Sequence, residues 1–172
     1  MNHNWQLDYQ ELEGYVFNNA AIKIESHAVL IPSAVREEFY TRFDKVREAF
    51  VRQFFSRELA MAEELKTAFL QTEAEAMSAL GLSGEAKVAA PLRWLVNDPL
   101  NGMIRPLFNP LFNLLKGKAS SEEFEETATR DIAGYFNKYY SAGYEKWVVF
   151  SLLKWLEPTE VLVMPVHDCN LY

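Results

Sequence analysis

Cysteine is almost absent from this 172-residue chain, since Cys169 is its single example. No internal disulfide can form, so the disulfide frameworks of small secreted domains are excluded. Glycine and proline number seven each, which is too few for a collagen-like or low-complexity chain. The opening residues, MNHNWQLDYQ, have neither the basic start nor the apolar core of a secretory signal. Together these features predict a cytoplasmic protein.

The motifs of several common enzyme and cofactor classes are also missing. The sequence has no G-x-G-x-x-G or P-loop phosphate cradle and no G-x-S-x-G nucleophile elbow. Zinc patterns of the H-E-x-x-H and C-x-x-C types are absent, and no histidine follows a glutamate by three residues, as a four-helix di-iron site requires. No cofactor is expected. Whether the chain is an enzyme stays open on this basis.

Positive charge and long apolar runs are both scarce. Lysine and arginine number 17 against 24 acidic residues, for a net charge of -7. An acidic surface repels phosphate backbones, so nucleic-acid binding is not expected. Uncharged stretches such as PLFNPLFNLL fall far short of the roughly 20 residues that cross a bilayer. No transmembrane segment is therefore expected.

What the sequence does contain is ample material for a helical core. Hydrophobic residues make up 49% and aromatic residues 14% of the chain, which suits a single helical domain over 1–172. No glycine or proline interrupts the stretch from Ser33 to Leu80, and apolar residues recur there every three or four positions. A continuous helix over 34–80 would be roughly 70 Å long. A break or strong bend near Ser56 is therefore expected, the alternative being a protruding helix that needs a partner.

Further helices follow in the second half of the chain. Short helices are expected between residues 91 and 118, where prolines suit first turns and Asp98 and Asn109 serve as caps. Ser120 and Glu123 have the spacing of a capping box, which predicts the start of a longer helix.

The tripeptide SAG at 141–143 is expected to end that longer helix. A last helix is then expected over about 144–156. Its predicted inward side chains are Tyr144, Trp147, Val148, Leu152 and Trp155.

Two segments have strand character and lie near the two ends of the chain. They are AIKIESHAVLI at 21–31 and EVLVMPV at 160–166. Unpaired backbone groups are costly beneath apolar side chains, so the two segments are expected to pair with each other. The predicted fold is mainly α, a bundle of five or six helices with a minor two-stranded β element near the chain ends. This pairing could also bring His27 toward His167.

The tail HDC holds the densest group of reactive atoms. His167 and Cys169 would share one face of a strand, and with His27 nearby they could form a metal site or an activated thiol. A polar strand end with a partly buried thiol is the favoured interpretation, because a catalytic cysteine and histidine normally come from separate elements.

Two apolar groups are candidate binding residues. Phe108 and Phe112 lie in a tandem PLFN within residues 104–118, a cationic stretch without acids that could meet a membrane surface or an anionic amphiphile. Burial of both phenylalanines in the core is the favoured alternative. The second group consists of Tyr135, Tyr139 and Tyr144 with Trp147, whose amphipathic rings suit pockets and interfaces.

The leading functional hypothesis is a non-enzymatic helical binding or interaction module, homo-oligomeric or docked to another protein. Its motive is a helix too long for the globule with aromatic residues on more than one face: Phe39, Tyr40, Phe43, Phe50, Phe54 and Phe55. The alternative is a protein that binds an apolar or anionic small molecule, or an enzyme with a site near His27, His167 and Cys169.

Overall fold

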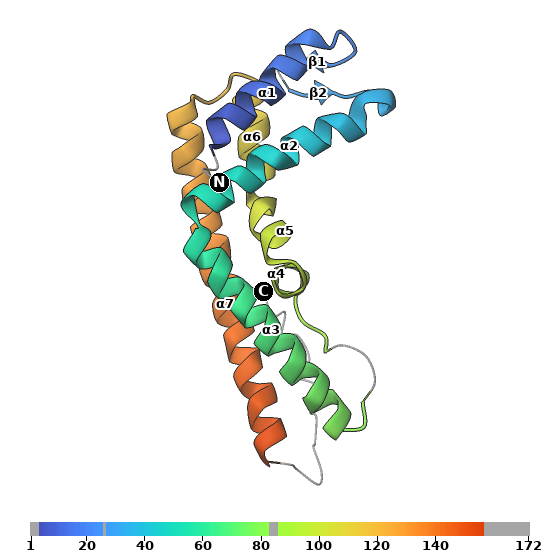
Figure 1. Cartoon of the computed structure of the whole chain (residues 1–172), viewed down its shortest axis with the longest axis vertical. Helices are drawn as coiled ribbons and strands as arrows, with labels where there is room; N and C mark the ends of the chain where they lie inside the picture. Colours follow the sequence, from blue (N-terminus) through green and yellow to red (C-terminus); the bar gives the residue numbers. More distant parts are fainter. Residues whose placement is uncertain (1–3, 26, 83–85, 157–172) are drawn as a thin grey trace. The chain divides into compact units, whose positions relative to one another are not determined.

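The computed structural model describes residues 4–25, 27–82 and 86–156, and most of them are helical (Figure 1). Helix α5, the 3₁₀ helix η1 and helix α6 follow one another without a gap from residue 99 to residue 115. The described residues therefore form six helical segments, and the predicted mainly α class is confirmed. The elements are α1 (Trp5–Asn18), β1 (Lys23–Ile24), β2 (Val29–Leu30), α2 (Ser33–Phe54), α3 (Ser56–Ala79), α4 (Ala90–Asn97), α5 (Pro99–Ile104), η1 (Arg105–Leu107), α6 (Phe108–Leu115) and α7 (Ser121–Leu156).

The small sheet is a local hairpin and does not join the two ends of the chain. Strands β1 and β2 are antiparallel, with Ile24 opposite Val29, and the Glu25 N–H donates to the Ala28 carbonyl at 2.8 Å. The predicted placement of this element near both chain ends is wrong. A strand can pair across a short turn at a lower loop-closure cost than with a distant segment. Residues 160–166 lie outside the described part of the chain.

The chain divides into two compact units. Unit 1 comprises Met1–Leu59 and Met103–Phe136, and unit 2 comprises Ala60–Gly102 and Asn137–Tyr172. Helix α7 contributes its first half to unit 1 and its second half to unit 2. The single domain expected over 1–172 stays a prediction.

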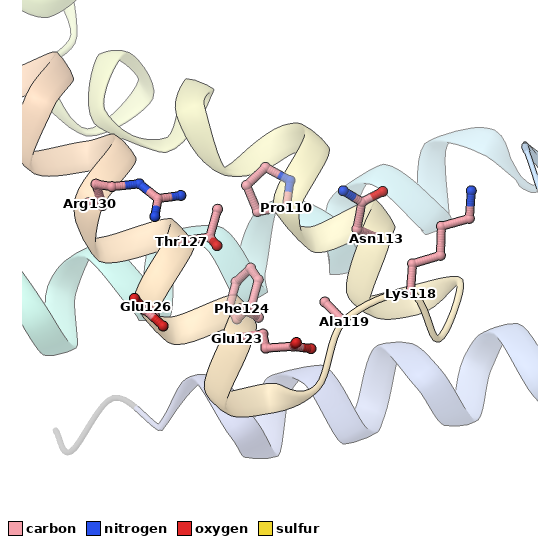
Figure 2. A pocket seen from close by; sticks show the side chains of 9 residues that line it. All are labelled: Pro110, Asn113, Lys118, Ala119, Glu123, Phe124, Glu126, Thr127 and Arg130. Carbon is pink, nitrogen blue, oxygen red and sulfur yellow. The ribbon is translucent and has the colours of Figure 1, made fainter.

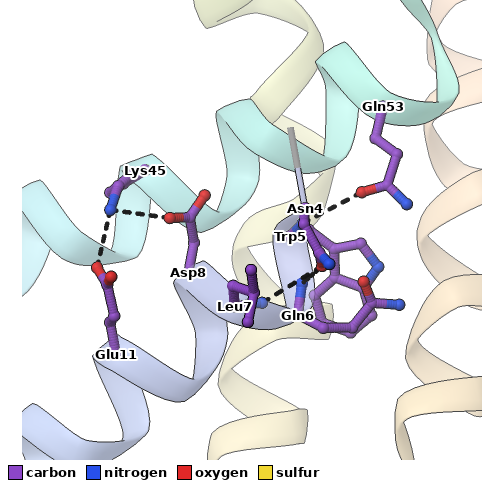
Figure 3. A network of polar contacts seen from close by, with 8 residues as sticks. All are labelled: Asn4, Trp5, Gln6, Leu7, Asp8, Glu11, Lys45 and Gln53. Atoms are coloured by element: carbon purple, nitrogen blue, oxygen red, sulfur yellow. Dashed lines mark hydrogen bonds and ion pairs between the residues drawn. The ribbon is translucent and has the colours of Figure 1, made fainter. Parts of the chain in front are cut away.

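In unit 1, α1 and α2 form an antiparallel helical hairpin held by polar contacts (Figure 3). The Lys45 ammonium lies 2.8 Å from a carboxylate oxygen of Asp8 and 2.8 Å from one of Glu11. The Lys45 hydrogen bond lowers the pKa of the Glu11 carboxyl. At the first residue of α1, the Trp5 backbone N–H donates to Gln53 Oε1 at 3.2 Å. These contacts fix the register of the two helices.

The core of unit 1 is largely aromatic. The Trp5 ring packs 4.9 Å from the Phe124 ring, and the Phe43 ring packs 4.6 Å from the Phe112 ring, centroid to centroid. Phe39, Phe43 and Phe50 of α2 are completely buried. The aromatic residues that motivated oligomerisation through α2 are thus mostly core residues of unit 1, and that motive is wrong.

The expected break near Ser56 is present. Helix α2 ends at Phe54, and Phe55 adopts a non-helical backbone conformation with φ -129° and ψ 29°. Helix α3 begins at the next residue, Ser56. Burial of the Phe55 side chain stabilises the break, because the ring then contributes to the hydrophobic core.

In unit 2, α3 lies beside the second half of α7 (Figure 1). The Trp147 indole N–H donates to Thr72 Oγ1 at 3.2 Å, and the Phe69 and Phe150 rings meet edge to face at 5.6 Å. The centre of this core consists of Leu65, Phe69, Leu92 and Val96. Helices α3, α4 and α7 therefore pack around one apolar centre.

Helix α7 is continuous from Ser121 to Leu156, so the predicted break at 141–143 is wrong. Gly143 is buried within unit 2. A Cβ at this position would lie 3.0 Å from side-chain carbons of both Leu65 and Leu92. Gly143 thus lets the side chains of α3 and α4 pack closely against α7. This packing offsets the cost of a glycine inside a helix, which is about 1 kcal/mol relative to alanine.

Candidate functional site

A buried ion pair holds the segment that leads into α4. Glu73 of α3 is 4% exposed, and its carboxylate accepts two hydrogen bonds from the Arg93 guanidinium, at 2.9 and 2.8 Å. The same carboxylate accepts the Ala86 N–H at 2.9 Å, while Arg93 donates to the Ala86 carbonyl at 2.7 Å. Both backbone groups of Ala86 are thereby bound, which positions α4 against α3.

The second half of α7 carries an exposed apolar surface, called here the α7 face. Its five side chains are between 49% and 79% exposed: Tyr144, Val149, Leu152, Trp155 and Leu156. Three of them, Tyr144, Leu152 and Trp155, were expected to face inward, and that expectation is wrong. Unit 2 is packed on another side of the helix, by Trp147 and Phe150. Apolar residues occupy nearly all sides of the helix over 144–156, and the core of unit 2 covers only one of these sides.

The spacing along α7 arranges part of this surface as a seam. Ala142, Glu145, Val149, Leu152 and Leu156 follow one another at intervals of three and four residues. This is the spacing with which a and d positions repeat in paired helices. Val149 and Leu156 then occupy a positions and Leu152 a d position, while Glu145 is the charged member of the seam. We call these five residues the α7 seam.

A cavity of about 140 Å³ adjoins the α7 seam, between α4 and α7. We call it the α4–α7 pocket. Leu92 is buried beneath it, and the charged side chains that line it come from α7. The Lys138 ammonium lies 5.3 Å from the centroid of the Tyr139 ring. The complete lining is Ala89, Leu92, Lys138, Tyr139, Ala142, Glu145 and Lys146.

The predicted tyrosine cluster is divided by the fold. Tyr135 belongs to unit 1, whereas Tyr139, Tyr144 and Trp147 belong to unit 2. Tyr139 lines the α4–α7 pocket, and the Tyr144 ring lies 5.4 Å from the Trp147 ring. Three of the four predicted residues therefore lie at or beside the surface described above. Whether they bind anything stays a prediction.

Phe108 and Phe112 lie on α6 in unit 1. The segment is ordered as expected, but Phe108 is 40% exposed and Phe112 is half-buried, so the prediction that both are buried is wrong. The buried stripe of this stretch runs through Leu107 and Leu111. Each phenylalanine is one position further on and falls at the margin of that stripe, where Phe108 also lies 5.6 Å from the Arg47 guanidinium.

The alternative metal site gains no support. His27 is exposed in the turn between β1 and β2, while His167 and Cys169 lie outside the described residues. Within residues 4–25, 27–82 and 86–156, no three His, Cys, Asp or Glu side chains gather as ligands of a metal ion. No helix in that part of the chain combines the length and the apolar character needed to cross a membrane.

A second cavity, in unit 1, shows a different chemistry (Figure 2). It has a volume of about 300 Å³ and lies between α6 and the start of α7. Lys118, Glu123, Glu126 and Arg130 bring charges of both signs to it. Glu123 already accepts the Ser120 N–H at 2.7 Å in the predicted capping box. The mixture of charges favours no single kind of ligand.

Sequence reasoning missed the Glu73–Arg93 pair and the α4–α7 pocket. A signal for the first exists, because Glu73 continues the buried stripe of Leu65 and Phe69 at a spacing of four residues. The pocket has no comparable signal, since its lining joins two segments about 50 residues apart. Comparison of the chain with protein-family models, curated proteins and solved structures finds no match.

Proposed function

We propose that this chain is a non-enzymatic helical interaction module that forms homodimers through the α7 face. The observation that carries the proposal is the exposure of five apolar side chains within thirteen consecutive residues, 144–156. Contiguous apolar surface of this kind marks protein interaction sites. Trp155 and Tyr144 supply aromatic side chains, which dominate the binding energy of many interfaces.

The free energy available at this face is considerable. Full burial of a leucine contributes about 1.5–3 kcal/mol, so covering a side chain that is 49% exposed, such as Leu152, contributes about half of that. Trp155 is 79% exposed and offers more apolar area. In a symmetric dimer each contribution counts twice. These terms oppose the loss of translational and rotational freedom on association.

A second copy is the partner that the α7 seam fits best. The seam places Val149 at an a position and Leu152 at a d position, the two positions at which apolar residues repeat in paired helices. A parallel arrangement would set Glu145 against its own copy. An antiparallel arrangement sets Val149 against Leu152 and moves Glu145 to the end of the seam, opposite Leu156. We therefore propose the antiparallel pair.

Light scattering over a wide concentration range, starting at micromolar protein, tests the dimer. Leu152→Glu removes the apolar contact from both copies and places a carboxylate in the seam. Loss of about 1 kcal/mol per copy weakens the dissociation constant by about 30-fold, before the cost of the charge. The matched control is Leu7→Glu, because Leu7 is also exposed but lies on α1 of unit 1. This variant should dimerise like the wild type.

A second variant should strengthen dimerisation, which is a result that misfolding cannot produce. Glu145→Leu removes the charge from the seam, and the dimer should therefore become tighter. A wild-type protein that stays monomeric at all concentrations would refute the homodimer. Equal weakening by Leu152→Glu and Leu7→Glu would refute the α7 face as its interface. The cytoplasmic location stays a prediction from the composition.

A further inference from the structure

The size and lining of the α4–α7 pocket point to a ligand class. Its volume of about 140 Å³ is close to that of an engineered protein cavity of roughly 150 Å³ that binds benzene. Leu92, Tyr139 and Ala142 provide apolar surface. A ligand that fits this space has an apolar group about the size of one six-membered ring.

The charges at the rim specify the other end of such a ligand. Lys138 and Lys146 line the pocket two helical turns apart, and Glu145 is the acid among the lining residues. In the part of the chain that the structure describes, neither lysine is within ion-pair distance of a carboxylate. The lining thus carries one net positive charge without a counter-charge. A single negative charge on the ligand would complement it.

The N-terminal end of α4 also favours an anionic ligand, as a smaller contribution beside the two lysines. Ala89 is the N-cap residue of α4 and lines the pocket. Among the described residues, no side chain caps this helix end. Backbone N–H groups at the start of a helix favour nearby negative charge. An anion in the pocket would therefore meet positive potential from both of its walls.

We propose that the α4–α7 pocket binds a small organic acid, a carboxylate attached to an apolar group of about the size of a benzene ring. The ring lies over Leu92 and Ala142, and the carboxylate lies at the rim between the lysines. The pocket adjoins the proposed dimer interface, because Ala142 and Glu145 belong both to the pocket lining and to the α7 seam, whereas Leu152 and Trp155 do not line the pocket. Ligand binding is therefore measured both in the wild type and in Leu152→Glu, in which the α7 face stays uncovered.

The test uses phenylacetate as the probe and backbone amide shifts in NMR spectra as the readout. A ligand of about ten non-hydrogen atoms is expected to bind with a dissociation constant of about 0.1–1 mM. Shifts should saturate and centre on Leu92, Tyr139 and Ala142. Phenylacetamide, which has the same shape without the charge, should bind at least fivefold more weakly. The titration is repeated in Leu152→Glu, so that self-association cannot be mistaken for ligand binding.

Two kinds of variant separate the apolar and the charged parts of the site. Ala142→Leu fills the cavity and should abolish saturable binding. The double variant Lys138→Met/Lys146→Met replaces the exposed Lys138 and the half-buried Lys146. It should weaken phenylacetate binding by about three- to tenfold, while phenylacetamide binding stays the same. The control is Lys87→Met, since Lys87 is exposed in unit 2 but does not line the pocket.

Four results would overturn the proposal. They are shifts that do not saturate, equal affinity for the acid and the amide, equal effects of the double variant and Lys87→Met, and unchanged binding in a folded Ala142→Leu variant. If Ala142→Leu fails to fold, the double variant and the neutral analogue still decide the outcome.

Discussion

The buried carboxylate of Glu73 should be among the least replaceable charges in unit 2. It receives three hydrogen bonds, two from Arg93 and one from the Ala86 N–H. Glu73→Ala removes all three at once. The Arg93 guanidinium, whose side chain is 14% exposed, is then left without its bidentate partner, and the Ala86 N–H loses its acceptor.

The expected cost follows from the burial of the pair. Breaking a buried ion pair by removing one partner costs about 3–5 kcal/mol when the remaining charge is left uncompensated. Arg93 keeps its hydrogen bond to the Ala86 carbonyl, so the loss should lie toward the lower end of that range. Glu73→Gln keeps the shape and one acceptor oxygen but loses the charge, and hydrogen bonds to charged groups contribute about 1.5–3 kcal/mol. Removal of both charges in Glu73→Met/Arg93→Met should cost less than Glu73→Ala, since apolar replacement of a buried pair is often neutral.

Urea unfolding followed by circular dichroism measures these differences. Glu64→Ala is the matched control, because Glu64 is an exposed glutamate of the same helix, and it should change the unfolding free energy by less than about 0.5 kcal/mol. The order of stability expected is wild type, then the double variant and Glu73→Gln, then Glu73→Ala. A loss in Glu73→Ala no larger than that in Glu64→Ala would refute the buried pair. If the effects of the single variants Glu73→Met and Arg93→Met add up to that of the double variant, the coupling of the two charges is refuted.

Two further predictions concern a close helix contact and a carboxyl pKa. Gly102→Ala should destabilise the protein, because the new Cβ would lie 2.9 Å from the Leu95 Cα. Gly134 has open space around it, so Gly134→Ala should instead stabilise α7 by about 0.5–1 kcal/mol. Thermal unfolding of the two variants measures both effects. The hydrogen bond from Lys154 lowers the pKa of the Glu75 carboxyl, so Lys154→Met should raise that pKa in an NMR titration. In the wild type this pairing stabilises the fold above the ordinary carboxyl pKa, and the stabilisation is lost as the pH falls through the lowered pKa.

Local signals in the sequence predicted those parts of the fold that local interactions decide. The capping box at Ser120 and Glu123 depends on residues three positions apart, and it is present. The break at Phe55 follows from the length of the apolar pattern relative to the size of the globule.

Features that depend on distant partners could not be read in this way. Gly143 was interpreted as a helix breaker because Leu65 and Leu92, the side chains that approach it, are far away in the sequence. In residues 144–156 apolar side chains occupy most directions around the helix, so periodicity could not choose the buried side. The candidate pocket joins α4 to α7 and has no local pattern. The sequence therefore predicted the helices better than it predicted their buried faces.

The continuity of α7 has a consequence for the order of folding. Starting a helix is unfavourable, while extending one adds a hydrogen bond for each residue fixed. Because the first 16 of its 36 residues belong to unit 1, an already formed first half provides a ready nucleus for the second half. Residues 137–156 can then become helical by propagation alone. Folding of the aromatic core around Phe124 would in this way accelerate formation of the helix that carries Leu152 and Trp155.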